Sequence, residues 1–436
     1  MPSYFYTMTT SALYEIYLQH PSVQTDTRKL KRGDLFFALK GPNFNANAFA
    51  QNALDAGAAY VVVDDPEYAN KENIILVDDV LNTLQELALH HRRQFKIPFI
   101  AVTGSNGKTT TRELIHAVLS ATFTTYTTRG NLNNHIGIPL TLLSIRPGAE
   151  MAVIEMGANH QGEIASYCRY TEPTHGLITN CGKAHLEGFG SEEGVRKGKG
   201  ELYDFLRATG GTAFVLKELD YLVQMSKGIR EIVFYGGEDS AVTGTITRNA
   251  PFLEAAVEAY GEAVVVKSNL VGAYNLPNIL AAMSVAHHFG VSSSSAADAI
   301  ANYYPSNNRS QLIDAPAGNK IILDAYNANP SSMRIAIENL ASLHAEKKVL
   351  ILGAMAELGP KSAEEHQRII ELIQQYTWAG VFLVGGDFLN VAHPYEQFET
   401  AEAAGKRVSA LGFTNAYMLI KGSRSRAMEN VLDAIR

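Results

Sequence analysis

The chain has little of what several classes of protein require. Its 436 residues include only two cysteines, Cys168 and Cys181, too few for a disulfide framework or a zinc site. No run approaches the roughly 20 apolar residues that a membrane-spanning helix needs. The first residues, Met1–Met8, lack the basic segment and apolar core of a signal peptide. We therefore expect no membrane span and a reducing, cytoplasmic location.

The chain also lacks the excess of positive charge that polyanion-binding proteins need. The formal net charge is −7, and no basic tract is interleaved with aromatic residues. Both features argue against a nucleic-acid partner, and any nucleotide must be held by a local positive site. Hydrophobic residues make up 46% and charged residues 19% of the chain, as in globular proteins. A chain of this length should form two to four domains.

Apolar runs alternate with helical patterns along the whole chain, which predicts an α/β protein with largely parallel sheets. We place domain boundaries after the polar cluster near Arg93 and within the turn-rich segment Tyr303–Ser310. The expected domains are 1–96, a small α/β unit, 97–309, a central unit, and 310–436, a unit with the rhythm of βαβ repeats. The segments Val242–Thr247 and Ala263–Lys267 predict a β excursion in the central domain.

The most informative segment is a strand, a glycine loop and a helix at residues 98–119. In this setting a Gly-Lys-Thr turn indicates a phosphate-binding loop, because backbone N–H groups and the helix N-terminus attract phosphate oxygens. Lys108 would reach the terminal phosphates and Thr109 would hold Mg²⁺. Val102 departs from the general pattern, which has glycine there, and an ordinary strand-to-helix turn is the alternative. The loop consists of Gly104, Ser105, Asn106, Gly107, Lys108, Thr109 and Thr110.

Polar clusters follow the next two predicted strands. Glu155 ends one apolar run and is placed to ligate Mg²⁺, although a surface glutamate is an equally plausible interpretation. His185 follows the second run as a possible metal ligand or phosphate contact. Lys197 and Lys199 lie on a predicted helix that starts at Ser191. Such a basic cluster is usually a solvated face, but two glycines weaken this helix, which is odd if it positions nothing.

Two further segments have chemistry that suits ligands. Asn131–Pro139 is an amide-rich turn whose donors and acceptors suit peptide or sugar groups, although such turns are also common for conformational reasons. Lys421–Arg424 follows a predicted strand and precedes a helix, which offers a second anion-friendly N-terminus.

Together these segments resemble the Mur ligases, the ATP-dependent amide-bond formers of peptidoglycan precursor synthesis. The resemblance covers nearly the whole chain, with several unrelated motifs in the right order. It rests on Asp26–Arg28, Gly33–Gly41, Thr103–Thr110, Gly130–Leu143, Glu155–Ile164, Asn180–Ser191, Asp324–Met333, Leu352–Gly359 and Lys421–Arg424.

The resemblance implies an N-terminal domain that holds a UDP-sugar, a central P-loop ATPase-type domain and a C-terminal Rossmann-like domain. It implies ATP and Mg²⁺, with Lys108, Glu155, His185 and Lys199 as catalytic residues. Lys199 matches the family lysine that CO₂ converts to a carbamate, with Lys197 as the alternative. The implied Mg²⁺ ligands are Thr109, Glu155, His185 and Lys199. The implied nucleotide contacts beyond the loop are Asn275, Asn278, Arg309, Asp324, Tyr326 and Asn327, and the substrate contacts are Thr27, Arg28, Lys40, Asn133 and Asn134.

The segments around Asn131, Glu155 and His185 favour the family member that adds D-alanyl-D-alanine to UDP-N-acetylmuramoyl-tripeptide through an acyl phosphate. The alternatives are a sister ligase that adds one amino acid, a folate-polyglutamate ligase, or a nucleotide-dependent switch. A monomer is expected. Three segments depart from the family pattern: Asn45–Asn47 where relatives usually show Asp-Gly-His, Ala354 in place of a commonly acidic residue, and Cys181–Lys183.

Overall fold

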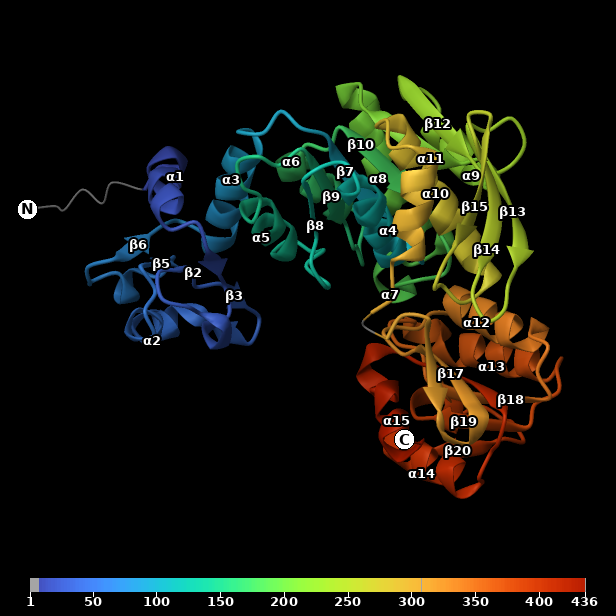
Figure 1. Ribbon diagram of the computed structural model, residues 1–436. Helices are drawn as coiled ribbons and strands as arrows, with labels where there is room; N and C mark the ends of the chain where they lie inside the picture. Colours follow the sequence, from blue (N-terminus) through green and yellow to red (C-terminus); the bar gives the residue numbers. More distant parts are fainter. Residues whose placement is uncertain (1–7, 307, 436) are drawn as a thin grey trace, which may run out of the picture. The chain divides into compact units, whose positions relative to one another are not determined.

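The computed structural model describes residues 8–306 and 308–435 (Figure 1). Most of the Met1–Met8 segment and Asn307 of the predicted second boundary lie outside the described residues. By their internal contacts the residues form two compact units. The first comprises Met1–Ala101, Phe123–Gly157 and Glu163–His175, and the second comprises Val102–Thr122, Ala158–Gly162 and Gly176–Arg436.

The first unit contains a four-stranded parallel sheet in the order β1-β2-β5-β6. Its two inner strands are almost wholly buried, as expected for parallel strands covered on both faces. The apolar runs Asp34–Leu39, Tyr60–Val63 and Ile74–Val77, which predict strands in the sequence, form β2, β5 and β6 within one or two residues. The elements are α1 (Thr10–Gln19), β1 (Val23–Gln24), β2 (Leu35–Phe37), β3 (Lys40–Gly41), β4 (Phe44–Asn45), α2 (Ala50–Asp55), β5 (Tyr60–Val63), β6 (Ile74–Leu76) and α3 (Val80–Arg92).

Helices α1 and α3 are joined by a buried aromatic cluster. The Tyr14 hydroxyl lies 3.0 Å from Nδ1 of His91, and the Tyr17 hydroxyl donates to the carbonyl of Leu143 at 2.6 Å. Burial raises the pKa of Tyr17 to about 12 and lowers that of His91, so both side chains stay neutral at pH 7. Asp79 caps α3 by accepting from the N–H of Asn82, which fixes where this helix begins.

A nine-stranded sheet has the order β15-β14-β13-β12-β11-β10-β7-β9-β8. The predicted β excursion is confirmed as an antiparallel meander, but its middle strand, β14, was not predicted. The strands are β7 (Phe99–Thr103), β8 (Thr125–Thr127), β9 (Met151–Glu155), β10 (His175–Ile178), β11 (Thr212–Leu216), β12 (Glu231–Tyr235), β13 (Val242–Arg248), β14 (Glu254–Ala259) and β15 (Glu262–Lys267).

Helices alternate with these strands, as the sequence predicts. They are α4 (Lys108–Ser120), α5 (Gly137–Leu143), α6 (Glu163–Thr171), α7 (Leu186–Phe189), α8 (Glu192–Thr209), α9 (Asp220–Ser226), α10 (Leu276–His288) and α11 (Ser293–Ala301). Helices α10 and α11 both pack against α4, the helix that follows the predicted phosphate loop.

The C-terminal residues form a six-stranded sheet in the order β16-β17-β21-β18-β19-β20, parallel except for the edge strand β16. One apolar cluster packs α12 and α13 on one face, and a second packs α14 and α15 on the other. This doubly wound arrangement is Rossmann-like. The elements are β16 (Gln311–Ala315), β17 (Asn319–Asp324), α12 (Pro330–Ser342), β18 (Lys347–Gly353), α13 (Ser362–Ile373), β19 (Gly380–Val384), β20 (Glu396–Phe398), α14 (Ala401–Ala410), β21 (Ala416–Lys421) and α15 (Leu432–Ile435).

Within the described ranges, none of the helices combines the length and the apolar character that crossing a bilayer requires.

Candidate functional site: a phosphate loop and its surroundings

The predicted phosphate loop connects the buried strand β7 to helix α4. Gly104 and Gly107 have φ angles of 147° and 79°, a region that disfavours other residues. A Cβ at Gly104 would collide with the Thr179 hydroxyl, and one at Gly107 would lie 2.7 Å from Oδ1 of Asn278. Glycine is therefore required at both positions, which explains the spacing that the sequence shows.

The loop is held by the residues that follow β10. The N–H of Ser105 donates to the carbonyl of Asn180 at 2.8 Å, and the N–H of Asn106 donates to its Oδ1 at 3.1 Å. The Thr179 hydroxyl donates to the carbonyl of Asn106 at 2.6 Å. These contacts hold the backbone of the loop against the residues that follow β10.

Lys108 begins α4 and folds back over the loop. Its Nζ donates to the carbonyls of Gly104 at 2.6 Å and Ser105 at 3.1 Å. The ammonium group is thus held at the mouth of the loop, where a phosphate could replace these carbonyls as its partner. Thr109 and Thr110 follow in the first turn of α4, with Thr109 almost fully buried.

Two of the predicted nucleotide contacts, Asn275 and Asn278, lie beside helix α4. Asn278 accepts from the Thr111 hydroxyl at 3.0 Å and donates to Oδ1 of Asn275 at 2.9 Å, and Asn275 donates to the carbonyl of Val271. Both amides are buried and partnered. The structure therefore brings Asn275 and Asn278 to the phosphate loop, in a chain of hydrogen bonds that links α10 to α4.

Four predicted nucleotide contacts gather around the carboxyl end of β17. The Arg309 guanidinium stacks 3.7 Å from the centroid of the Tyr326 ring. Asp324 pairs with Lys421 at 2.5 Å, and Lys421 also donates to the carbonyl of Asn327 at 3.2 Å. Lys421 was predicted only as part of an anion-friendly turn. Its partner Asp324 lies 97 residues away, on a neighbouring strand.

Three residues of the C-terminal sheet region (residues 310–435) contact the phosphate loop or the loop that carries Lys183 and His185. Asn329 donates to Oδ1 of Asn106 at 2.8 Å. Glu365, which is 3% exposed, pairs with Lys183 at 2.8 Å. Oε2 of Glu357 lies 2.5 Å from Nδ1 of His185, and this contact lowers the pKa of the Glu357 carboxyl. Sequence reasoning assigned no role to any of the three, although Asn329 and Glu357 lie in motifs that it singled out.

The two candidate lysines on α8 differ sharply in environment. Lys199 is fully buried, with Nζ 5.2 Å from the centroid of the Phe189 ring, whereas Lys197 is exposed. Burying an ammonium group costs free energy that a solvated lysine does not lose. The burial of Lys199 therefore indicates a role that the exposed Lys197 does not share. Ser191 caps α8 by accepting from the N–H of Gly194, as predicted.

Glu155 and the amide-rich turn belong to the first unit. Glu155 is 1% exposed and accepts from Nδ2 of Asn133 at 2.8 Å, so the structure brings these two predicted residues together. Asn134 instead accepts from the N–H groups of Ile136 and Gly137 at the start of α5. Its side-chain oxygen therefore serves the local backbone.

Thr27, Arg28 and Lys40, which are predicted to bind the UDP-sugar, lie in the N-terminal sheet region of the first unit (residues 8–96). Thr27 and Arg28 form a short turn, in which Arg28 is exposed and pairs with Asp26 at 2.9 Å. Lys40 pairs with Asp64 at 2.8 Å. Asp64 also accepts from the amide of Asn47 at 2.9 Å, so the departure at residues 45–47 supplies a buried amide that links this loop to β5.

Among residues 8–306 and 308–435, no three His, Cys, Asp or Glu side chains gather into a metal-binding group. Cys181 lies beside the loop, but burial raises the pKa of its thiol to about 11, so it carries no thiolate at pH 7.

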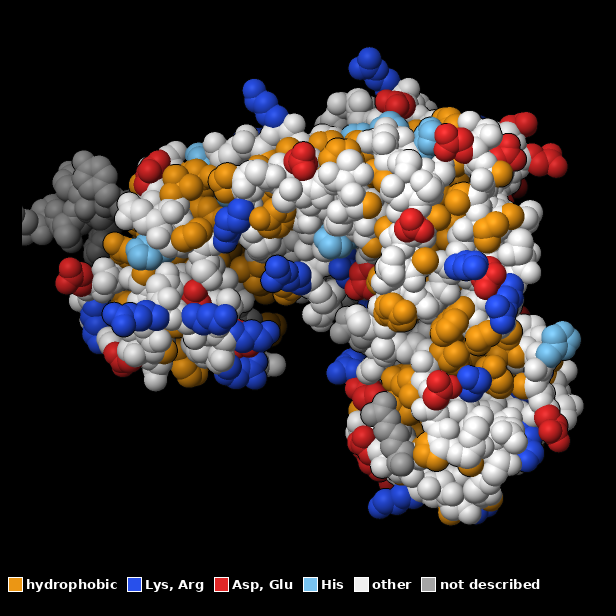
Figure 2. Space-filling model, in the orientation of Figure 1, with side chains coloured by type: hydrophobic (Ala, Val, Ile, Leu, Met, Phe, Trp, Pro, Cys, Tyr) orange, Lys and Arg blue, Asp and Glu red, His pale blue; other side chains and the backbone are white. Residues whose placement is uncertain are grey.

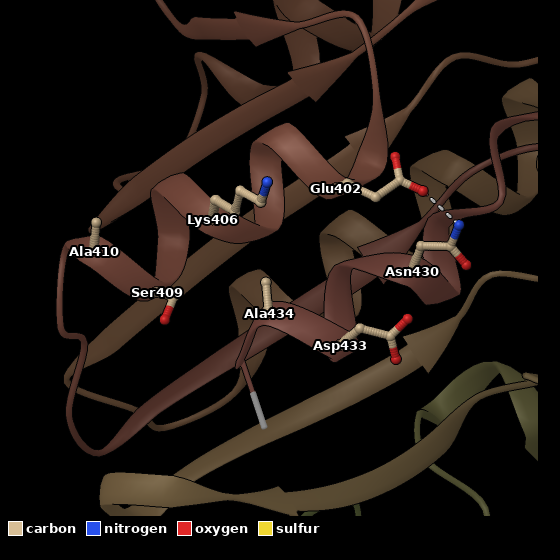
Figure 3. Close-up of a pocket in the computed structure, with 7 residues that line it drawn as sticks. All are labelled: Glu402, Lys406, Ser409, Ala410, Asn430, Asp433 and Ala434. Atoms are coloured by element: carbon tan, nitrogen blue, oxygen red, sulfur yellow. Dashed lines mark hydrogen bonds between the residues drawn. The ribbon is translucent and has the colours of Figure 1, made fainter.

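A hollow between α14 and the C-terminal end contains none of the predicted site residues (Figure 3). Its side chains are largely exposed, and Asn430 donates to Glu402 across its rim at 2.6 Å. The close-up shows Lys406 extending along α14 toward Glu402. Nothing in this hollow competes with the phosphate loop as the functional site.

Three family models match the chain in order. The Mur ligase family catalytic domain matches residues 21–92, the Mur ligase middle domain matches residues 102–286, and the Mur ligase glutamate ligase domain matches residues 308–434. With the full-length similarity to individual proteins described next, they place this protein plainly: the chain belongs to the Mur ligase family.

Individual proteins within this family are similar to the chain over nearly its whole length. The UDP-N-acetylmuramoyl-tripeptide–D-alanyl-D-alanine ligase of Escherichia coli is 36% identical over 95% of this chain and 93% of its own. The crystal structure of MurF from Acinetobacter baumannii has a TM-score of 0.87 at 31% identity, covering 95% and 93% of the two chains. The crystal structure of MurF ligase from Thermotoga maritima in complex with ADP has a TM-score of 0.86 at 28% identity, covering 96% and 97%.

Proposed function

We propose that this chain uses ATP to join D-alanyl-D-alanine to the terminal carboxylate of UDP-N-acetylmuramoyl-tripeptide. The observation that carries the proposal is the rigid loop at residues 104–109, which is held by Asn180 and contacted by Asn329. Near-full-length similarity to ligases of that name supports the choice of substrates. A sister ligase that adds a single amino acid is the alternative.

The chemistry explains why such a loop is needed. A carboxylate is a poor electrophile, because its charge repels an incoming amine and it offers no good leaving group. Transfer of the γ-phosphate to a carboxylate oxygen gives an acyl phosphate. The dipeptide amine then attacks the carbonyl carbon, and phosphate leaves with the C–O bond electrons. No protein nucleophile is required, so the chain contributes positioning and charge neutralisation.

Lys108 is the residue that we propose for charge neutralisation at the transferred phosphate. Its Nζ lies against the loop carbonyls of Gly104 and Ser105, which holds the ammonium group at the loop. A preorganised cation stabilises the charge that develops during phosphoryl transfer without reorganising at that moment. Asn275, Asn278, Arg309, Asp324, Tyr326 and Asn327 complete the proposed nucleotide site.

Two of the proposed ligands, the Thr109 hydroxyl and the Glu155 carboxylate, are oxygen donors of the kind that Mg²⁺ binds. Mg²⁺ prefers oxygen ligands and commonly takes only one or two carboxylates beside substrate phosphates, so a dense acidic cluster is unnecessary. We propose Thr109, Glu155, His185 and a carbamylated Lys199 as its ligands. When bound, the ion would neutralise the phosphate oxygens of ATP. Lys199 can ligate only after its ammonium has become a carbamate, and its complete burial favours it over the exposed Lys197 for that role.

For the UDP-sugar we propose Thr27, Arg28 and Lys40, with Asn133 and Asn134 contacting the substrate. Figure 2 shows Lys and Arg side chains gathered on the face of the N-terminal sheet region, which suits an anionic diphosphate. The proposed domains are 1–96, 97–309 and 310–436, close to the ranges that the family models match. We further propose that the enzyme acts as a cytoplasmic monomer without a nucleic-acid partner.

The decisive assay measures phosphate release from ATP. We expect release only when UDP-N-acetylmuramoyl-tripeptide and D-alanyl-D-alanine are both present. D-alanine, L-lysine and diaminopimelate serve as control amines. Release with a single amino acid and the corresponding shorter acceptor would favour the sister ligase.

Lys108→Ala tests the assignment of the loop. We expect at least about a 100-fold loss of phosphate release, which corresponds to about 2.7 kcal/mol of lost transition-state stabilisation. The melting temperature should stay close to that of the wild type, because Lys108 is only partly buried. A fully active Lys108→Ala protein would refute the role of the loop.

A further inference from the structure

Two residues with unusual backbone conformations face each other beside the phosphate loop. His185 and Glu357 have φ angles of 50° and 61°, a region that residues other than glycine seldom occupy. Their side chains meet, with Nδ1 of His185 2.5 Å from Oε2 of Glu357. The N–H of Glu187 also donates to the carbonyl of Glu357 at 3.2 Å. Unfavourable backbone conformations are retained at both residues where the two side chains meet. Such conformations indicate a constraint on function rather than on folding.

The segment that carries Glu357 is rigid. The N–H of Met355 donates to Nε2 of His366 at 3.0 Å, and Nδ1 of His366 donates to the carbonyl of Ser362 at 2.8 Å. His366 is fully buried, and burial lowers its pKa, so it stays neutral and keeps this pattern. The Ser423 hydroxyl donates to the carbonyl of Ala354 at 2.7 Å. Glu357 is therefore presented from a fixed support.

The loop that carries His185 is held on both sides. The Ser105 hydroxyl donates to the carbonyl of Gly182 at 2.8 Å, which links this loop to the phosphate loop. On the other side, the N–H of Lys183 donates to the Ser331 hydroxyl at 3.0 Å, and its Nζ pairs with Glu365. The imidazole thus lies between the phosphate loop and the C-terminal sheet region.

We propose that Glu357 is a positioning residue that orients His185 for metal ligation. A carboxylate beside Nδ1 keeps the proton on that nitrogen, which leaves Nε2 unprotonated and able to bind a metal ion. Glu357 acts through His185, and because it comes from the C-terminal sheet region, the orientation of the ligand depends on that region being in place. The inference rests on the proposed role of His185 as a magnesium ligand.

The test is a titration of the full-length enzyme with Mn²⁺, whose free ion gives an electron paramagnetic resonance signal, at saturating ADP. We expect E357A to weaken Mn²⁺ binding about 10- to 100-fold, the range typical of residues that orient metal ligands. E357Q should lose less, because its amide oxygen can still accept from Nδ1. The control is E364Q, which removes an exposed carboxylate paired with Arg368 and should bind Mn²⁺ as the wild type does.

A double-mutant cycle separates the possible failures. H185A should weaken binding as much as E357A or more, and H185A/E357A should lose no more than H185A. If H185A weakens binding and E357A does not, or if the two losses add, the inference about Glu357 is wrong while the proposed ligand stands. If H185A binds Mn²⁺ normally, the ligand assignment itself fails. A second readout is the imidazole ¹⁵N spectrum without metal, where E357A should remove the signature of an Nδ1-protonated His185.

Discussion

At the scale of single residues, the contrast between Lys197 and Lys199 carries most weight. The two lie two positions apart on α8, yet one is exposed and the other fully buried. Their sequence context alone left both open as the carbamylated residue. Burial favours Lys199 for the proposed carbamate. Lys197 is solvated like most surface lysines, and nothing in its environment distinguishes it from them.

We expect Lys199→Ala to reduce phosphate release about 100-fold or more, because the proposed carbamate oxygens are lost from the metal site. Added acetate should restore part of the activity, because a small carboxylate can occupy the space of the carbamate. The measurement is the initial rate with and without acetate. Lys197→Ala is the matched control and should stay near the wild-type rate, whereas a loss confined to Lys197→Ala would show that the wrong lysine was chosen.

The residues that sequence analysis found and those it missed differ in one physical respect. Gly104, Gly107 and Lys108 follow from local chemistry, since their spacing alone defines a loop that can surround a phosphate. Asn180 and Asn329 support the same loop from 74 and 223 residues away. No local pattern specifies such a pairing, because it is created when distant strands come to lie side by side.

At the scale of elements, the packing of helix α8 explains Gly198, one of the two glycines that looked out of place in its sequence. A Cβ at Gly198 would lie 2.5 Å from Cε1 of Phe189, so the absence of a side chain lets this ring pack against the helix. The same ring lies near Nζ of Lys199. The helix therefore gives up propensity at Gly198 to position an aromatic ring next to the buried lysine.

The expected effect of alanine differs between Gly198 and Gly200, the two glycines of α8 that flank Lys199. Gly198→Ala should destabilise the protein by about 1–3 kcal/mol, because overpacking outweighs the gain of about 1 kcal/mol in helix propensity. At Gly200 a Cβ would meet only the flexible end of Met225, at 3.2 Å. Gly200→Ala should therefore be neutral or stabilising. Thermal unfolding of both variants checks this, and equal melting temperatures would contradict the packing argument.

The bounds of buried strands were easier to predict from the sequence than the pairing of strands in the sheet. Three runs that predict strands in the sequence, Tyr60–Val63, Thr212–Leu216 and Gly380–Val384, coincide residue for residue with β5, β11 and β19. The agreement arises because buried parallel strands are continuous apolar segments. Strand β14, Glu254–Ala259, consists of three alanines, two glutamates and one valine and gave no such signal. Its place is fixed by antiparallel pairing with β13 and β15, which only the folded chain reveals.

At the scale of the whole molecule, the segment between the central and C-terminal sheets is anchored at both ends. The Tyr303 hydroxyl donates to Glu113 on α4 at 2.5 Å, and Asn269 donates to the carbonyl of Tyr303 at 3.0 Å. At the far end, the Tyr274 and Ser310 hydroxyls lie 2.9 Å apart. A ligase must exclude water from its acyl phosphate, so the freedom of this segment matters for catalysis.

Tyr303→Phe should loosen the first anchor. We expect hydrogen exchange of the amides in residues 300–306 to become several-fold faster, because one of the contacts that hold the segment to α4 is lost. Mass spectrometry of peptides from this region measures the change. Tyr304→Phe is the control, since Tyr304 is 71% exposed. Identical exchange in wild type and Tyr303→Phe would show that the hydroxyl does not restrain the segment.

The supports of the phosphate loop also bear on how the protein is made. The ribosome synthesises the chain from the N-terminus to the C-terminus. Gly104–Thr109 therefore emerge long before Asn180, Asn278 and Asn329. The nucleotide loop can acquire its final set of contacts only after about three quarters of the chain has been synthesised. Truncated or stalled products that end before Asn329 therefore carry the complete Gly-Lys-Thr motif in an unfinished setting.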